Sequence, residues 1–158
     1  MLVCGSATIK QMSLITNRKA GFNYEFLEKY TAGIELFGYE VKSLKESHGS
    51  IEGAHITVRG GEAFIVGMFI PPYQQNNTPK DYDPYRTRRL LLNKEEIVKI
   101  AKTEATKGLT IVPISVYNSN GKIKLEIAEV RGKKKFDKRE TLKKKDSLRD
   151  VARELKDR

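Results

Sequence analysis

Two short turn sequences, each lying between apolar segments, constrain the fold of this chain more than any other feature. The pair Asn120–Gly121 joins strands expected at 109–117 and 122–130, and Gly60–Gly61 lies within the apolar stretch 54–66. Glycine supplies positive φ without strain, and Asn-Gly is a pair that type I′ turns favour. Each pair therefore predicts two antiparallel strands, and together they favour a fold built mainly from β-structure.

Shorter elements precede and separate these hairpins. Residues 17–21 form a predicted basic turn. Residues 22–30 begin with alternating apolar and polar side chains, which predicts a strand that ends before Ala32, and a second short strand is expected at 34–37. The stretch between the glycines at 38 and 49 is long enough for one short helix.

One longer helix is predicted near the middle of the chain. Asn93 can cap its first turn, Glu96 occupies the third helical position, and Gly108 is placed to end it. Several short strands, one such helix and a closing hairpin predict a mostly β fold: an OB-like closed β-barrel with peripheral helices. A closed barrel leaves no free sheet edge, and OB-like barrels commonly bind oligonucleotides.

The chain of 158 residues suggests one domain plus a tail. We predict a flexible leader at 1–16, an OB-like body at 17–131 and a basic C-terminal tail at 132–158. Cys4 is the only cysteine, which excludes an internal disulfide and makes a reducing cytoplasm the simplest compartment. No apolar run reaches the roughly 18 residues of a membrane-spanning helix, and residues 1–9 lack the features of a signal peptide.

Positive charge is concentrated in the last segment. Residues 131–158 contain 13 of the 30 lysines and arginines but only 6 of the 20 acidic residues. A dense cationic segment attracts a polyanion, because each neutralised phosphate releases a condensed counterion. This division predicts a folded body that holds one part of an RNA and an arm that contacts something else.

The tail also carries a helical pattern. Leu148, Val151, Ala152 and Leu155 recur at the spacing of one helix face, and Ser147 is placed as an N-cap. So narrow an apolar stripe supports only a marginal helix in water. We therefore predict a conditionally helical tail, disordered in isolation and helical on contact with RNA. The alternative is a solvated, highly charged terminus without a role.

Residues suited to catalysis or metal binding are few. His48 and His55 are the only histidines, and they do not have the spacing of a metal-ligand pair. Asp81 and Asp83 could hold a hard cation, but they lie in a proline-rich loop, where Asp before Pro commonly starts a turn. We expect no enzyme activity, no metal and no cofactor, although active-site partners can lie far apart in sequence.

Two basic segments suit RNA better. Arg86 and Arg88 alternate along an extended segment, so both should point to one side at a spacing that suits successive phosphates, and arginine also stacks on bases. Arg18–Lys19 is a second basic pair, beside the aromatic residues Phe22 and Tyr24, which could stack on unpaired bases. A solvated loop for the arginines and a core position for Phe22 fit the pattern equally well.

Segments distributed over most of the chain resemble one bacterial protein family. The resemblance runs from Asn17 to Arg139, and its motifs are weak singly but specific in this order and spacing. They are Asn17–Arg18–Lys19–Ala20, Ala32–Gly33–Ile34, Gly38–Tyr39–Glu40–Val41–Lys42–Ser43–Leu44, Gly61–Glu62–Ala63–Phe64, Asp83–Pro84–Tyr85–Arg86–Thr87–Arg88–Arg89–Leu90–Leu91–Leu92, Gly132–Lys133–Lys134 and Asp137–Lys138–Arg139. On these motifs the chain resembles the SsrA-binding proteins (small protein B), the partners of transfer-messenger RNA.

The resemblance implies a role in trans-translation. It implies that an OB-like body cradles the tRNA-like domain of transfer-messenger RNA (SsrA RNA) and delivers it to a stalled 70S ribosome, where the tail occupies the decoding centre and the empty mRNA channel. Translation then switches frame, the nascent chain is tagged for degradation and the ribosome is rescued. The implied partners are this RNA, the ribosome and, through the aminoacylated RNA, elongation factor Tu. The implied state is a cytoplasmic monomer without membrane contact.

Two sets of functional residues follow from the resemblance. The RNA-binding set is Asn17, Arg18, Lys19, Tyr24, Gly33, Gly38, Glu40, Lys42, Arg86, Arg88, Leu91 and Asn93. The decoding-centre and tail set is Gly132, Lys133, Lys134, Phe136, Asp137, Lys138 and Arg139, to which the apolar stripe adds Leu155. Thr31 departs from the family pattern, in which an acidic residue often precedes Ala-Gly. Phe136 also departs from it, because phenylalanine can stack but cannot donate a hydrogen bond as tyrosine or histidine does.

Three other functions fit parts of the pattern. A generic basic OB-fold protein of the translation apparatus would share the barrel but would not need the tail. A ribonuclease would need a general base or a metal, for which Asp81 and Asp83 are the residues to substitute. A protein of anionic membranes would bind acidic vesicles in competition with RNA.

Overall fold

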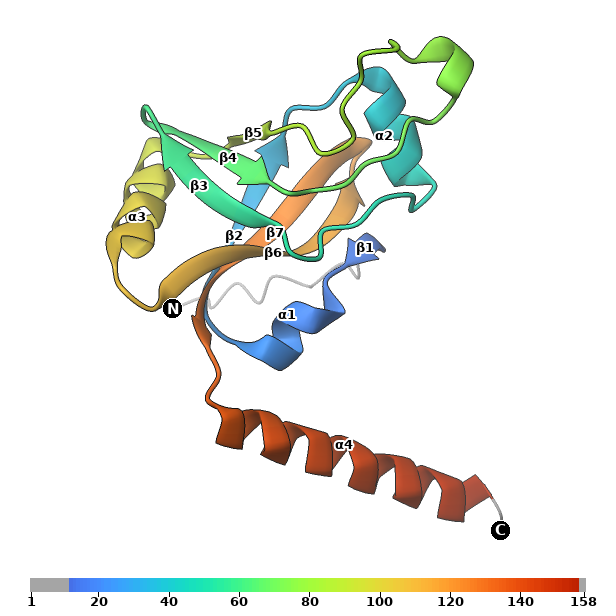
Figure 1. The fold of residues 1–158 in the computed structure, drawn as a ribbon, viewed down its shortest axis with the longest axis vertical. Coiled ribbons are helices and arrows are strands. Elements are labelled where there is room, and N and C mark those ends of the chain that lie inside the picture. Colours follow the sequence, from blue (N-terminus) through green and yellow to red (C-terminus); the bar gives the residue numbers. More distant parts are fainter. Residues whose placement is uncertain (1–11, 157–158) are drawn as a thin grey trace, which may run out of the picture.

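Seven antiparallel strands form one curved sheet in the described residues, 12–156, of this computed structural model (Figure 1). They are β1 (Ser13–Thr16), β2 (Tyr24–Ile34), β3 (His55–Arg59), β4 (Glu62–Val66), β5 (Arg88–Leu91), β6 (Leu109–Ser119) and β7 (Lys122–Gly132). The order across the sheet is β1-β6-β7-β2-β5-β4-β3. The predictions for Cys4 and for stacking by Phe136 fall outside the described part, which excludes residues 1–11, residues 157–158 and the Phe136 side chain.

Both predicted hairpins are confirmed. Asn120 and Gly121 have φ of 51° and 81°, and they join β6 to β7. Gly60 and Gly61 have φ of 58° and 76°, and they join β3 to β4. Positive φ at both central positions is the property of a type I′ turn that the residue types predicted.

The sheet does not close into the barrel that the sequence predicted. Its two ends are β1 and β3, and β3 passes close to β6 without pairing with it. On the outer edge of β3, the Val58 N–H donates to the Glu104 carboxylate (2.9 Å), and the Thr57 hydroxyl donates to the same group (2.6 Å). A side chain from a packed helix thus satisfies the edge, so no strand partner is needed there. The mostly β class is confirmed, and the closed barrel is not.

The described residues also form four α-helices and one 3-10 turn. They are α1 (Arg18–Asn23), α2 (Gly38–Lys45), α3 (Lys94–Ala105), α4 (Lys135–Lys156) and η1 (Gln75–Asn77). The predicted short helix and mid-chain helix are confirmed as α2 and α3, and the Asn93 N–H donates to the Glu96 carboxylate (3.0 Å) at the start of α3. Gly108 has φ of +85° but lies beyond the C-cap of α3, which is Thr106.

Three local predictions are wrong. The segment predicted as a basic turn is α1, because the Asn17 side chain accepts from the Ala20 N–H (3.1 Å) and caps a helix. Ala32 and Gly33 do not end a strand, since β2 continues through both while pairing with β7. Residues 13–16 pair with β6 as strand β1, inside the predicted leader.

The core lies within the curve of the sheet. Leu44 from α2, Ile100 from α3 and Ile127 from β7 are fully buried in one apolar cluster. Burial of each such side chain contributes about 1.5–3 kcal/mol, so this cluster fixes both helices against the strands. A smaller cluster, which includes Val112 and Val130, lies beneath α1 and holds that helix on the other side of β6 and β7.

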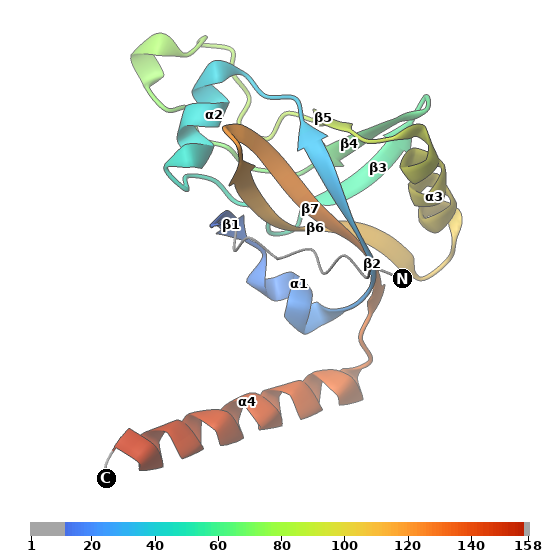
Figure 2. The ribbon, with the colours of Figure 1, turned by 180° about the vertical axis from the view of Figure 1, so that it is seen from behind.

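Helix α4 projects from this body (Figures 1 and 2). Leu148 and Leu155 are each 71% exposed, and neither apolar cluster of the described residues includes a residue of α4. Ser147, predicted as an N-cap, lies inside the helix and donates to the carbonyl of Lys143 (3.0 Å). No helix of the described residues is long and apolar enough to cross a lipid bilayer.

Candidate nucleic-acid interface

A single buried carboxylate organises the surface around α2. Glu40 lies in the first turn of α2 with its side chain fully buried. Its Oε2 accepts from the Phe37 N–H (2.8 Å) and from Arg86 Nη2 (2.6 Å). Its Oε1 accepts from Arg86 Nε (2.9 Å), from Nε (2.9 Å) and Nη2 (2.8 Å) of Arg88, and from the Tyr82 hydroxyl (3.0 Å). Burial by itself would raise the pKa of Glu40, but these hydrogen bonds and the positive charges hold that pKa below its ordinary value.

The guanidinium of Arg88 is fully buried and bonded within the protein. Besides Glu40, it donates to the carbonyl oxygens of Met68 (2.8 Å), Arg86 (3.0 Å) and Pro84 (3.1 Å). A buried charge persists in a fold when it is paired and hydrogen-bonded. Arg88 therefore fastens the proline-rich loop to α2 from beneath, and its bonded donors do not face solvent.

Arg86 presents a different surface. Its side chain is 25% exposed, and its guanidinium lies 4.3 Å from the centroid of the Phe37 ring, which is itself 51% exposed. The hydrogen bond to Glu40 raises the pKa of Arg86. Tyr39 packs against Phe37 and, with the two rings nearly perpendicular, against Tyr82. Burial, followed by the bond to Glu40, raises the pKa of Tyr82 to about 12. Above the buried Glu40 carboxylate, the surface therefore consists of uncharged aromatic rings and the positive charge of Arg86.

The two alternating arginines do point to one side, but that side faces Glu40. Arg86 stays partly exposed, whereas Arg88 supports the surface from inside. Gly38 begins α2, and Lys42 lies on the exposed face of the same helix with its Nζ 5.9 Å from the centroid of the Tyr73 ring. The structure therefore brings five predicted residues together: Gly38, Glu40, Lys42, Arg86 and Arg88. Of these, Glu40 and Arg88 are buried and support the surface from below.

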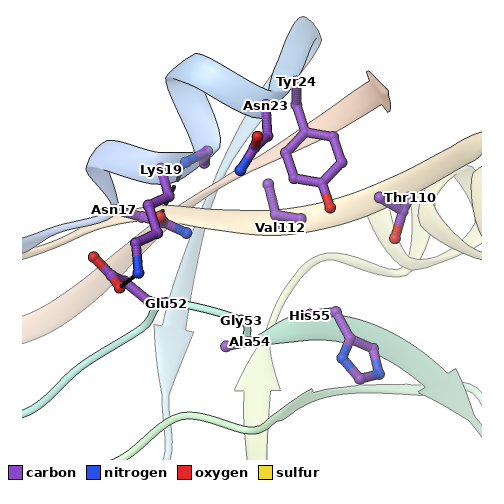
Figure 3. Close-up of a pocket in the computed structure, with 11 residues that line it drawn as sticks. Asn17, Lys19, Asn23, Tyr24, Glu52, Gly53, Ala54, His55, Thr110 and Val112 are labelled. Atoms are coloured by element: carbon purple, nitrogen blue, oxygen red, sulfur yellow. Dashed lines mark hydrogen bonds and ion pairs between the residues drawn. The ribbon is translucent and has the colours of Figure 1, made fainter. Parts of the chain in front are cut away.

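A second group of predicted residues borders a polar cleft of about 560 Å³ between α1, β3 and β6 (Figure 3). Asn17 is buried at its back, where Nδ2 donates to the carbonyls of Pro113 (3.1 Å) and Ile51 (3.4 Å). Lys19 lies on the rim and forms an ion pair with Glu52 (2.6 Å). Asn17 thus positions α1, and α1 positions Lys19.

Two more predicted residues flank this cleft. Figure 3 shows Tyr24 at the start of β2, with its hydroxyl directed toward the cleft, and His55 on β3 at the opposite rim. Arg18 is exposed on α1 beside Lys19. Phe22 is partly buried, an arrangement between the two alternatives that the sequence left open.

The third group lies on a ridge formed by β2 and β5. A β-carbon at Gly33 would lie 3.2 Å from Leu91 Cβ, so glycine lets Leu91 pack closely over β2. Leu91 is 56% exposed and lines two hollows, one of about 570 Å³ beside Asn93 and one of about 280 Å³ beside Lys124. Thr31 lines the first of these hollows. The ridge therefore places an exposed apolar side chain between a polar hollow and a mostly apolar one.

Comparison with known proteins places the chain in a family. The family model of the SmpB protein matches residues 14–157. The chain belongs to the SmpB family. An SsrA-binding protein of Clostridium tetani is 43% identical over 92% of this chain and 93% of its own length. One of Solidesulfovibrio magneticus is 48% identical over 88% of this chain and 90% of its own length. A chain in the solved structure described as "tmRNA-SmpB: a journey to the center of the bacterial ribosome" is 38% identical, with a TM-score of 0.65, over 77% of this chain and 85% of that one.

The predicted tail set of this SmpB-family chain begins where the sheet ends. Gly132 is the last residue of β7. Lys133 then turns back to α1, where its N–H donates to the Asn23 carbonyl (3.0 Å) and its Nζ donates to the Gly21 carbonyl (3.1 Å). The root of the tail is thereby fixed to the last turn of α1.

The rest of the tail set lies in or next to α4. Lys134, Asp137, Arg139 and Leu155 are exposed, and Lys138 is partly buried. Apart from the hydrogen bonds of Lys133 and the contacts of α4 with α1, the described tail residues stand away from the three groups of the body.

Sequence reasoning missed residues whose partners lie far along the chain. Glu52 and His55 border the α1 cleft without belonging to any motif that pointed to them. Tyr82 was visible only as the residue between two aspartates, yet it bonds to Glu40. Asp83 accepts from the Tyr85 N–H (2.9 Å), which is the turn geometry that Asp before Pro favours.

Proposed function

We propose that this protein binds the tRNA-like domain of transfer-messenger RNA (SsrA RNA) and delivers it to stalled ribosomes in trans-translation. The observation that carries the proposal is membership of the SmpB family over residues 14–157. The relatives named as SsrA-binding proteins support it, because they align with this chain over nearly their whole length. So does the similar chain in the tmRNA-SmpB structure.

The three groups on the body suit an RNA that is recognised by shape and by unpaired bases. Arg86 over Phe37 offers a cation and a ring, both partly exposed. Arg18, Lys19 and Lys42 place further charges on α1 and α2. Aromatic rings and guanidinium planes stack on unpaired bases, and lysines hold phosphates. In this proposal Glu40, Arg88 and Asn17 position the contacting residues and do not touch the RNA.

The tail is proposed to act on the ribosome. Helix α4 is exposed, rich in lysine and arginine, and joined to the body mainly through its root. In the proposed mechanism Lys134, Asp137, Lys138 and Arg139 lie at the decoding centre, and the helix continues into the empty mRNA channel with Leu155 against its wall. The nascent chain is then tagged and the ribosome is released.

The proposed partners extend to elongation factor Tu, which would reach the complex through the aminoacylated RNA. The protein is proposed to work in the cytoplasm as a monomer and as a binding protein. A generic RNA-binding role in translation is the competing function, because a basic β-rich body would serve it as well. The tail favours the specific role, since a generic module would not need it.

Sequencing the RNA that copurifies with the protein from its host tests the proposal. Transfer-messenger RNA should dominate the bound fraction, and the isolated tRNA-like domain should bind more tightly than an elongator tRNA of similar size. A bound fraction of mixed ribosomal and transfer RNA, without enrichment of that one species, would favour the generic role.

A further inference from the structure

We infer that the cleft between α1, β3 and β6 receives one unpaired nucleotide of the bound RNA, and that Glu52 holds Lys19 until a phosphate replaces it. The inference rests on the proposed RNA-binding function. It adds a binding site for a single base, and it identifies the Glu52 carboxylate as a group of the protein that competes with the RNA for Lys19.

The shape of the cleft suits a flat aromatic group with polar edges. Val112 on β6 gives it an apolar floor, Ala20 and Ala54 add to its apolar lining, and Asn23 and Thr110 place polar atoms around it (Figure 3). Its volume of about 560 Å³ lies within the range of small-molecule sites. A nucleobase would lay its face on the floor and direct its edge to the amide and the hydroxyl.

The walls leave room for such a group to enter. Tyr24 supplies a ring on the side of α1 and β2 (Figure 3). On the β3 side, Gly53 has φ of +76° and no side chain, and a β-carbon placed there would meet nothing within 4 Å. His55 stands at the rim with its side chain exposed. Bases stack on aromatic side chains with little dependence on sequence.

The ion pair at the rim is weak enough for a phosphate to replace Glu52 as the partner of Lys19. Lys19 Nζ lies 2.6 Å from Glu52, but the two side chains are 72% and 43% exposed. An exposed pair of this kind contributes little to stability, whereas a phosphate offers Lys19 another charge-assisted partner. Once the phosphate arrives, the Glu52 carboxylate repels it. Glu52 therefore weakens binding in the wild-type protein.

Removing the competing carboxylate is the decisive test. Glu52→Gln should tighten binding of the tRNA-like domain by about two- to five-fold, the ratio that corresponds to one exposed ion pair. Glu28→Gln is the matched control, because Glu28 is an exposed glutamate that pairs with Lys99 (3.9 Å) away from the cleft. Both variants remove one negative charge, so only an effect specific to Glu52 supports the inference.

The two histidines provide an internal reporter of base insertion. His55 borders the cleft and His48 does not, so proton NMR of the imidazole signals separates the two positions. Titration with the RNA should shift the His55 signals and leave those of His48 in place. Thr110→Phe should fill the cleft and weaken RNA binding by about tenfold or more, the loss expected for one stacked base, while its melting temperature shows whether the variant folds.

The outcomes separate this inference from the proposed function. If the RNA binds but Glu52→Gln matches Glu28→Gln and the His55 signals stay fixed at saturation, the inference is wrong and the RNA-binding function stands. Adenosine monophosphate is titrated in parallel. If it binds the cleft as tightly as the RNA does, the cleft belongs to a free nucleotide, which also overturns the inference. If the wild-type protein binds no RNA, both proposals fail together.

Discussion

Glu40 shows how one side chain can determine a surface without being part of it. Its carboxylate accepts from two arginines, one tyrosine and one backbone N–H, so α2, the proline-rich loop and β5 meet at one buried charge. Removing one partner of a buried pair leaves the other charge without compensation. The resemblance to the family placed Glu40 among RNA-binding residues, and the structure gives it a role through Arg86 and Phe37.

The first prediction concerns this buried pair. Arg88→Ala should lower the free energy of unfolding by about 3–5 kcal/mol, since it leaves the Glu40 carboxylate buried with one arginine missing. Arg89→Ala is the control, because the neighbouring Arg89 forms only an exposed ion pair with Glu62 (2.7 Å) and should cost less than about 1 kcal/mol. Urea unfolding measures both. Equal losses for the two variants would show that the buried network contributes no more to stability than one exposed ion pair.

The second prediction concerns Arg86, the partly exposed arginine of the pair. Arg86→Lys keeps the charge but cannot keep both the bidentate contact with Glu40 and the stack on Phe37. Binding of the tRNA-like domain should weaken by about 1–3 kcal/mol, with a smaller effect on unfolding than Arg88→Ala. Binding titrations and melting curves are compared for the two variants. Unchanged affinity would remove Arg86 from the RNA surface.

At the scale of elements, the sequence predicted those features that depend only on residues adjacent in the chain. The turns at Asn120–Gly121 and Gly60–Gly61 needed only their own residue types, and Asn93 with Glu96 was sufficient for α3. The open edge of the sheet at β3 depends instead on Glu104, whose bonds to β3 cross 46 and 47 positions of sequence. The inward direction of Arg88 likewise depends on Glu40, which lies 48 positions away. Neither contact produces a periodic pattern of residues by which the sequence could have predicted it.

The third prediction concerns the contact of α3 with β3. Hydrogen bonds, first that from the Thr57 hydroxyl, lower the pKa of Glu104 in the folded protein. A lowered folded pKa contributes stability above the ordinary value of 4.5, and this contribution is lost as the pH falls through the folded pKa. The free energy of unfolding should therefore fall less steeply below about pH 5 in Glu104→Gln than in the wild-type protein. Identical pH profiles by urea unfolding would contradict the role of this carboxylate.

The fourth prediction concerns α4. Because Leu148, Val151 and Leu155 are exposed in the free protein, Leu155→Lys should leave the melting temperature and binding to the isolated RNA unchanged. It removes apolar burial of about 1.5–3 kcal/mol on the ribosome, so tagging on stalled ribosomes should fail. Val151→Pro should fail in the same assay, because proline in a helix interior costs roughly 3 kcal/mol. Tagging at the wild-type rate by both variants would reduce the tail to a cationic tether.

The whole molecule is divided by charge as well as by shape. Residues 131–158 hold 13 of the 30 basic residues, and most of them stand on a helix that leaves the body. Deletion of 135–158 keeps Lys133 on α1 and leaves the sheet intact. It should therefore weaken RNA binding only by an electrostatic share and reduce the slope of log affinity against log salt. Loss of binding at low salt would place part of the RNA surface on the tail.

The position of the tail on the sheet has a mechanical consequence. The chain enters α4 from β7, which is hydrogen-bonded along its length to β6 on one side and to β2 on the other. Tension along β7 loads many of these bonds at once in shear, whereas the bonds of α4 yield one after another. Pulling on the C-terminus in an optical trap should first draw out the 22 residues of α4, an extension of about 4 nm. The sheet should rupture only later, at higher force, so the tail can act as an extensible spring whose stretching leaves the RNA-facing body undeformed.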